Sequence, residues 1–327
     1  MARLRVFAHG SLAALLLSAS ALSAAYPERP VRLIVGQAAG GASDIIARVY
    51  AQALAAEIGH HVVVDNRSGA GGIIGAQIVA QAAPDGHTLL LGTNGPIAIA
   101  PHLNEKVGYE PLRDFAPVAL FSEVPYIMVV HPSVPAKTLG ELVAIAKAKP
   151  GHLHYGSSGL GGTPHLCMEL LKLLTGIDML HVPYRGGAPA QADLVAGRVQ
   201  AYCAGFPGLL PHVRSGKLRA LTVTAPVRAR LMPQLPTAAE AGIPGFEVNA
   251  WNGVLAPAKT PPWVIERLHA ATVRLSARPD YEKDIEARGV EKLVLGPKEF
   301  AAYIRAESEK WRKVVAGGQG PEQGRAR

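Results

Sequence analysis

Four glycine-rich loops carry the residues of this sequence that are best suited to chemistry. Each loop follows a short apolar run, and most precede a stretch with helical periodicity. Their hydroxyl side chains and main-chain amides suit anion binding, because a helix N-terminus offers unpaired N–H donors and a partial positive charge. The four loops are residues 36–44, 69–75, 92–95 and 157–163.

The glycine spacing in these loops disfavours a nucleotide site. Residues 69–75 read Gly-x-Gly-Gly-x-x-Gly, so Ile74 stands where a dinucleotide fingerprint has its last glycine. None of the four loops has the pattern of a P-loop, G-x-x-x-x-G-K-[ST]. We therefore expect no nucleotide, and no other cofactor.

Hydrolytic and metal chemistry also lack their motifs. Leu160 occupies the closing position of a G-x-S-x-G nucleophile elbow, and no H-E-x-x-H occurs. His152 and His154 share one face of a predicted strand, but no third ligand is near, so we expect no metal site. Many main-chain donors and few nucleophiles predict a binding protein and not an enzyme.

Alternating strands and helices position the loops. The runs 31–35, 61–65 and 88–92 are continuously apolar or β-branched, which is typical of strands buried on both faces of a parallel sheet. Helices are expected between them, at about 43–58 and 73–81. Ligands of such sheets bind at the carboxyl ends of the strands, where these loops lie.

The same pattern restarts at about residue 126, which predicts a second α/β module. Beyond it lies a proline-rich stretch, residues 232–262. The further strands are expected at 126–130, 154–156, 179–182, 199–203 and 218–223, and the further helices at 138–148, 163–175, 189–196, 262–276 and 297–315.

Composition limits the class of protein. The chain has 327 residues, of which 49% are hydrophobic and 18% charged, so it can bury two cores and is not intrinsically disordered. The formal charge of +8 is not gathered in a basic run with interleaved aromatic residues, which disfavours nucleic acid as a partner.

The N-terminus reads as a secretory signal peptide. Arg3 and Arg5 precede an apolar run from Leu12 to Leu22, which is too short to span a bilayer. Small residues at 23–25 place cleavage after Ala25. We expect residues 1–25 to be removed and the product to be periplasmic.

Export leaves two alternatives for the cysteines. In an oxidising compartment Cys167 and Cys203 can form a disulfide. Two buried thiols that act as small hydrophobic residues fit the sequence equally well.

An ordered set of motifs resembles a known family. The set is YPERPVRLIV at 26–35, GGASDIIAR at 40–48, NRSGAGG at 66–72, YGSSG at 155–159, VPYRGGAP at 182–189, LPTAAEAG at 235–242 and WNG at 251–253 with AP at 256–257. In these residues the sequence is similar to the periplasmic substrate-binding receptors of tripartite tricarboxylate transporters, the Bug family. The resemblance covers nearly the whole chain after residue 25.

The resemblance implies a type II periplasmic-binding-protein fold, in which two α/β lobes close on a ligand held in the cleft between them. Lobe 1 would be discontinuous, comprising residues 26–124 and 251–327. Lobe 2 would comprise residues 125–250. The C-terminal helices would pack on lobe 1.

The resemblance also implies a set of ligand-binding residues on both lobes. On lobe 1 they are Gly40, Gly41, Ser43, Asp44 and Asn94. On lobe 2 they are Ser157, Ser158, Gly162, Thr163, Arg185, Gly186 and Gly187, with Gly205 and Phe206 at the ligand or the hinge.

One loop departs from the family pattern. Residues 36–39 read Gly-Gln-Ala-Ala where the family has an aromatic residue and prolines, so Gln37 can donate an amide to the ligand in an enlarged or wetter pocket. Asp44 fits equally well an acid favoured by the helix dipole, and Arg185 an ordinary surface arginine.

Together these features predict a periplasmic receptor that binds a small organic carboxylate. It would be a monomer that delivers the ligand to membrane transporter subunits by hinge closure, with no metal, cofactor or turnover. Two alternatives remain open: a sensory receptor for a signalling partner, and an exported α/β hydrolase.

Overall fold

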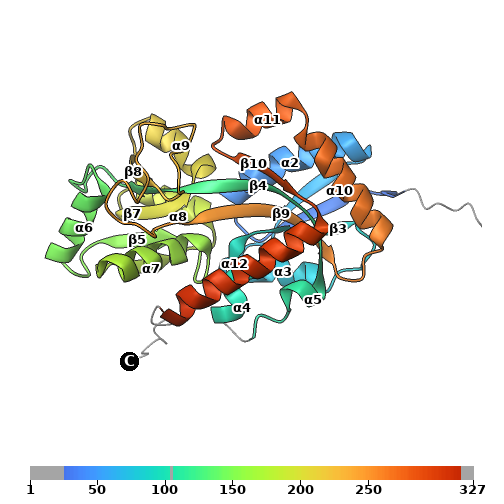
Figure 1. Ribbon diagram of the computed structural model, residues 1–327, viewed down its shortest axis with the longest axis horizontal. Coiled ribbons are helices and arrows are strands. Elements are labelled where there is room, and N and C mark those ends of the chain that lie inside the picture. Colours follow the sequence, from blue (N-terminus) through green and yellow to red (C-terminus); the bar gives the residue numbers. More distant parts are fainter. Residues whose placement is uncertain (1–25, 104–105, 318–327) are drawn as a thin grey trace, which may run out of the picture.

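A computed structural model describes residues 26–103 and 106–317 (Figure 1). The predicted signal peptide, residues 1–25, lies outside the described residues. The strands are β1 (Val31–Val35), β2 (Val62–Asn66), β3 (Thr88–Gly92), β4 (Phe115–Val130), β5 (His154–Ser157), β6 (Leu180–Pro183), β7 (Ala201–Gly205), β8 (Arg219–Val223), β9 (Asn249–Pro257) and β10 (Glu291–Leu295).

The helices alternate with these strands along most of the chain. They are α2 (Ala42–Ile58), η1 (Ala70–Gly72), α3 (Ile73–Ala80), η2 (Gly95–Ile99), α4 (Ala100–Leu103), α5 (Pro111–Asp114), α6 (Leu139–Ala148), α7 (Thr163–Thr175), α8 (Gly187–Val195), α9 (Phe206–Arg214), α10 (Pro262–Ser276), α11 (Pro279–Glu286) and α12 (Pro297–Gly317).

The strands form two groups that share β4. In the first group, β2, β1 and β3 are parallel, and β9 joins β3 to β4 in antiparallel pairing. In the second group, β4 pairs with β7 and β8, while β5 lies parallel to β6 and β7. Buried apolar side chains line both faces of β1 and β3, as their continuous apolar runs predict.

The long strand β4 changes partners in its middle. It pairs with β9 up to Pro125, and from Tyr126 it pairs with β7 and β8. Figure 1 shows β4 and β9 running side by side from one half of the molecule to the other. The predicted lobe boundaries, at residues 124 and 251, fall beside this change, and the division into two lobes stays a prediction.

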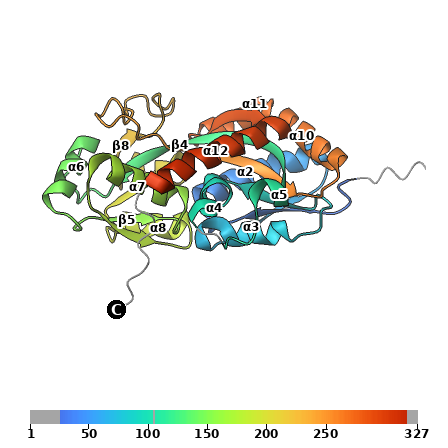
Figure 2. The same cartoon turned by 60° about the horizontal axis from the view of Figure 1, so that its bottom comes forward.

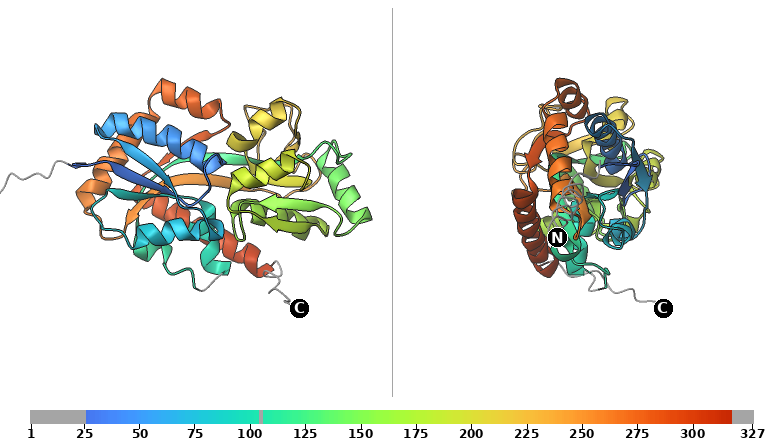
Figure 3. Two further views of the ribbon diagram at one scale, coloured as in Figure 1. Left: turned by 180° about the vertical axis from the view of Figure 1, so that it is seen from behind. Right: turned by 90° about the vertical axis from the view of Figure 1, so that its right-hand side faces the viewer.

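Helices cover the strands on both sides. Figure 3 (left) shows α2 and α3 on opposite faces of the first group. Helix α12 runs from the first group toward the second across the middle of the molecule (Figure 2). Phe300 packs in a core of the first group, and Trp311 packs in a core of the second. The C-terminal helices were expected to pack on lobe 1, and Trp311 adds a contact with the second group.

Several elements of the fold were not predicted from the sequence. Strand β9 lies inside the stretch read only as proline-rich, and the first half of β4 was not predicted. Pro117 and Pro125 interrupt the apolar pattern of β4. Helices α9 and α11 are short and were also missed.

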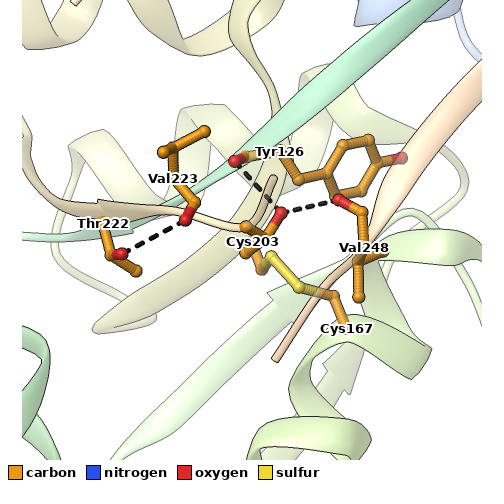
Figure 4. The surroundings of a disulfide bond; sticks show 7 residues. Tyr126, Cys167, Cys203, Thr222, Val223 and Val248 are labelled. Atoms are coloured by element: carbon orange, nitrogen blue, oxygen red, sulfur yellow. Dashed lines mark hydrogen bonds between the residues drawn. A yellow bond between two sulfur atoms is a disulfide. The ribbon is translucent and has the colours of Figure 1, made fainter. Parts of the chain in front are cut away.

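Of the two alternatives for the cysteines, the structure contains the disulfide. Cys167 of α7 is bonded to Cys203 of β7, and both residues are fully buried (Figure 4). Beside it, the hydroxyl of Thr224 donates to the carbonyl oxygen of Val248 over 2.6 Å and lies 3.1 Å from that of Tyr126, which accepts from the Thr224 amide. The disulfide therefore fixes α7 to the sheet close to the point where the chain crosses between the two groups.

We expect the double variant C167A/C203A to lose about 2–4 kcal/mol of unfolding free energy, because the bond closes a loop with a sequence separation of 36. Denaturant unfolding of the oxidised protein and of the variant measures this loss. Reductant should destabilise the wild type and leave the variant unchanged. Equal stability of the two proteins would contradict the prediction.

Candidate ligand-binding site

A pocket lies between the two groups of strands and receives residues from both. Its cavity volume is about 50 Å³. Eight of the residues predicted from the sequence line it: Gln37, Gly41, Ser43, Ser158, Gly162, Thr163, Gly187 and Gly205.

Five helices begin at this pocket. The residues that precede α2, α7, α8 and α9 are Gly41, Gly162, Gly186 and Gly205, and none of the four helices has a side-chain cap. The fifth is η2, whose first residue, Gly95, lines the pocket. First-turn amides have no partner within their own helix, so these glycines leave N–H donors free to bind a ligand.

No described residue that lines the pocket carries a formal charge. Its polar side chains are amides and hydroxyls, among them Gln191, Tyr202 and Asn252. Burial raises the pKa of Tyr126 and of Tyr202, which therefore remain neutral phenols. Tyr126 also forms a hydrogen bond with Thr163, at the start of α7. The positive charge that this lining can offer a ligand is therefore the partial charge of the helix N-termini.

Glycine contacts close the rim of the pocket. A Cβ on Gly71 would lie 2.7 Å from the carbonyl oxygen of Leu160, and a Cβ on Gly95 would lie 3.1 Å from that of Gly71. Gly71 has a φ of +66°, which side-chain-bearing residues rarely adopt. Loops from the two groups therefore touch backbone to backbone.

Seven of the predicted residues are absent from the pocket lining. Gly40 is exposed, and its amide donates to the carboxylate of Asp44 over 2.9 Å. Burial alone would raise the pKa of Asp44, but hydrogen bonds from Arg48 and from the Gly40 amide hold it below its ordinary value. Asp44 therefore fits the alternative reading as an acid in the first turn of α2.

Asn94 is fully buried and bonds to other parts of the protein. Its side-chain amide donates to Glu307 of α12 over 2.8 Å, and its side-chain oxygen accepts from the amide of Trp251. Glu307 also accepts from the indole nitrogen of Trp311. Asn94 thus connects η2, β9 and α12.

Ser157, Phe206, Arg185 and Gly186 complete the seven. The Ser157 hydroxyl is turned toward His181, 2.6 Å from its Nε2. Phe206 is fully buried. Arg185 is exposed, as an ordinary surface arginine would be, and Gly186 is the residue before α8.

Sequence reasoning missed several pocket residues that follow simple periodicities. Val124 and Tyr126 on β4, Ala250 and Asn252 on β9, and Tyr202 and Ala204 on β7 are two apart, so each pair faces one side of its strand. Gln191 lies one turn beyond Gly187 on α8. Once the strands are known, alternation alone points to these side chains.

A buried polar cluster lies behind the loop of residues 157–162. The ring of His181 stacks between those of Tyr155 and His165, at centroid distances of 4.9 and 4.2 Å. Burial, and then the charge that His165 can carry, lower the pKa of His181 to about 3. Burial also lowers the pKa of His165.

The charged groups that face these rings are Glu169 and Lys172 of α7. The Lys172 ammonium lies 3.0 Å from the Glu169 carboxylate, which also accepts a short hydrogen bond from the Tyr155 hydroxyl. Burial alone would raise the pKa of Glu169, but these two partners hold it below its ordinary value.

The α/β layers and the uncharged pocket ringed by helix N-termini define a solute-binding receptor of the periplasmic-binding-protein type. The family model described as "Tripartite tricarboxylate transporter family receptor" matches residues 46–318. The chain belongs to this family. The match confirms both the resemblance and the predicted fold class.

Similar proteins agree with this assignment. Protein BugT of Bordetella pertussis is 37% identical over 291 residues, which cover 89% of each chain. The structure titled "R. palustris Rpa4515 with adipate" has a TM-score of 0.87 and 36% identity, covering 89% of this chain and 98% of that one. MatC from Rhodopseudomonas palustris, solved with bound malate, has a TM-score of 0.84 and 34% identity, covering 89% of this chain and all of that one (100%).

Within residues 26–103 and 106–317, no helix is both long and apolar enough to span a membrane.

We expect acid to destabilise the protein through His181. An unfolded histidine titrates near its ordinary pKa of about 6.5, whereas His181 in the fold titrates near 3. Protons therefore bind the unfolded chain more tightly, and the free energy of unfolding falls as pH drops from about 6.5 toward about 3.

Thermal unfolding between pH 8 and pH 4 measures this effect. The Tm should fall over the acid part of the range, and less steeply in His181→Phe, which cannot take up the proton. The same pH slope in both proteins would contradict the assignment to His181.

Proposed function

We propose that the protein is a periplasmic receptor that binds a small dicarboxylate and delivers it to the membrane subunits of a tripartite transporter. The observation that carries the proposal is the convergence of helix N-termini on a pocket without charged side chains. Partial positive charges on both sides of the pocket suit a ligand with an anionic group at each end.

The class of ligand follows from the size and chemistry of the pocket. The pocket is small, with a cavity volume of about 50 Å³, which favours a small ligand over a bulky one. The similar proteins solved with adipate and malate support the same class. The amides of Gln37 and Gln191 and the hydroxyls of Ser158 and Tyr202 line the pocket and would bind the rest of the ligand.

The protein acts by binding and release, without turnover. The lobes, residues 26–124 with 251–327 and residues 125–250, would move about β4 and β9, where β4 changes partners. Closure brings together the amides of α2 and η2 with those of α7, α8 and α9, so the ligand stabilises the closed state. The sequence of residues 1–25 supports export to the periplasm.

The first experiment is native mass spectrometry of the purified protein before and after unfolding and refolding, followed by calorimetry with succinate, malate, adipate and citrate. A dicarboxylate should bind, and its uncharged diamide should not. At a concentration 100 times its Kd, the ligand should raise the Tm by about 5 °C.

A matched pair of variants tests the anion site directly. In Gly187→Asp, the new carboxylate at the first residue of α8 should repel the ligand and weaken binding about tenfold or more, whereas the neutral Gly187→Asn should bind more tightly than Gly187→Asp. Absence of an adduct and of any thermal shift across the panel would refute carboxylate binding.

Closure should depend on the glycine contacts at the rim. We expect Gly71→Ala to weaken dicarboxylate binding about tenfold, because its Cβ would meet the carbonyl oxygen of Leu160 at 2.7 Å and hold the lobes apart. Calorimetry measures the affinity, and small-angle scattering measures the compaction on ligand addition.

Gly59→Ala is the control for backbone strain. Gly59 has a φ of +74°, similar to that of Gly71, but no atom lies within 4 Å of its added Cβ. Both variants should lose stability, and only Gly71→Ala should lose affinity. Equal affinities would show that closure does not need this contact.

A further inference from the structure

Ser157 and His181 form a close pair that the pocket lining does not include. The Ser157 Oγ lies 2.6 Å from the Nε2 of His181, and Ser157 is fully buried. Ser157 ends β5 and His181 lies on the neighbouring strand, β6, so the sheet brings together residues that are 24 apart in sequence. A serine beside a histidine raises the question of whether it is a nucleophile or a structural group.

The hydrogen bonds of the Ser157 hydroxyl answer this question. The Oγ accepts from the amide of Gly159 over 3.1 Å and lies 3.2 Å from the carbonyl oxygen of Gly159. A hydroxyl has one proton to donate, and the carbonyl can only accept, so a bond to the Gly159 carbonyl uses the proton of Ser157. All three bonds form together only if the Nε2 of His181 carries a proton and donates it to Ser157.

This arrangement leaves His181 unable to serve as a base for Ser157. With that proton placement, the nitrogen that faces the hydroxyl acts as a donor, and the Ser157 proton points to a carbonyl oxygen. A fully buried Oγ is also closed to a substrate. The pair is therefore a support for the loop of residues 157–162 and not a catalytic dyad.

The loop supported in this way carries part of the pocket. Ser158 and Gly162 line the pocket on either side of Gly159, and the amide of Gly162 donates to the carbonyl oxygen of Gly159 over 3.1 Å. The amide of Gly161 donates to the Nδ1 of His165 over 3.2 Å. His165 in turn stacks on His181, so both histidines contact the loop on the side away from the pocket.

We propose that His181 is a positioning residue for the ligand site: its Nε2–H fixes Ser157, and Ser157 fixes the turn that presents Ser158 and the start of α7 to the ligand. The inference rests on the proposed binding function for its effect on affinity. Its effect on the loop is independent of any ligand.

Three single variants separate the hydrogen bond from the ring. His181→Phe keeps an aromatic ring between Tyr155 and His165 but removes the donor. His181→Gln restores a donor without the ring, and Ser157→Ala removes the acceptor. His152→Phe, at an exposed histidine, is the control for loss of a histidine.

The ligand-free readouts are ¹⁵N NMR of the histidine rings and amide hydrogen exchange. The His181 signals, assigned by their loss in His181→Phe, should show a protonated Nε2 and an unprotonated Nδ1. Exchange at Gly159, Gly161 and Gly162 should be about tenfold faster in His181→Phe and in Ser157→Ala, and near the wild-type rate in His181→Gln and His152→Phe. A protonated Nδ1, or unchanged exchange, would overturn the proposal.

Affinity for malate and adipate gives the functional readout. His181→Phe and Ser157→Ala should each weaken binding about tenfold, and the double variant should be no weaker than either one, since both break the same bond. Additive losses, or wild-type affinity in His181→Phe, would overturn the positioning role. If the wild type binds neither acid, these ligands of the proposed function fail, and the NMR and exchange data still decide the role of His181.

Discussion

The constraint on which the rest of this structure depends is the gathering of uncapped helix N-termini at one pocket. Four of the five helices that meet there follow a glycine, and none of the four has a side-chain cap. Away from the pocket, α6 instead begins at Thr138, whose hydroxyl accepts from the amide of Glu141. Unpaired donors in a recessed site without charged side chains favour an anion over water, because less solvent screens their partial charges.

The architecture explains how so many helix N-termini reach one place. The helices that follow parallel strands begin at the same edge of the sheet. Strands β4 and β9 connect the two groups, so that two such edges face each other. The disulfide holds α7 to β7, and Thr224 joins β4 to the segment that enters β9. Asn94 connects η2 to α12 through Glu307, so the C-terminal helix stabilises the position of η2 beside the pocket.

The sequence predicts those elements whose signals are local. Strands β1 and β3 are short apolar runs, and α2 and α7 each end at a glycine in the left-handed region, Gly59 and Gly176. Strand β9 was not predicted, because prolines surround it and Gly253 interrupts its apolar pattern. Its place beside β4 is fixed by pairing between residues more than 120 positions apart, which no local pattern reveals.

The same limit applies to the site. Glycines and hydroxyls after strands single out Gly41, Ser158, Gly162 and Thr163, and these four residues line the pocket. The signal is local, because the geometry of a helix N-terminus suits anions. Asn94 and Ser157 have equally suitable side chains, yet the fold directs them to Glu307 and His181. Residue type indicates which groups a side chain can bind. The tertiary structure decides whether its partner is a ligand or another residue of the protein.

The glycine N-caps have a consequence for how such a receptor can diversify. Charge recognition carried by backbone amides survives most substitutions of the side chains around it. Under the proposed function, substitutions of lining residues such as Gln37, Gln191 and Tyr202 would alter which carbon skeleton is accepted, while affinity for the acid groups would be retained. A gene duplicate of this chain starts with its anion site intact, and a few substitutions are enough to explore new ligands.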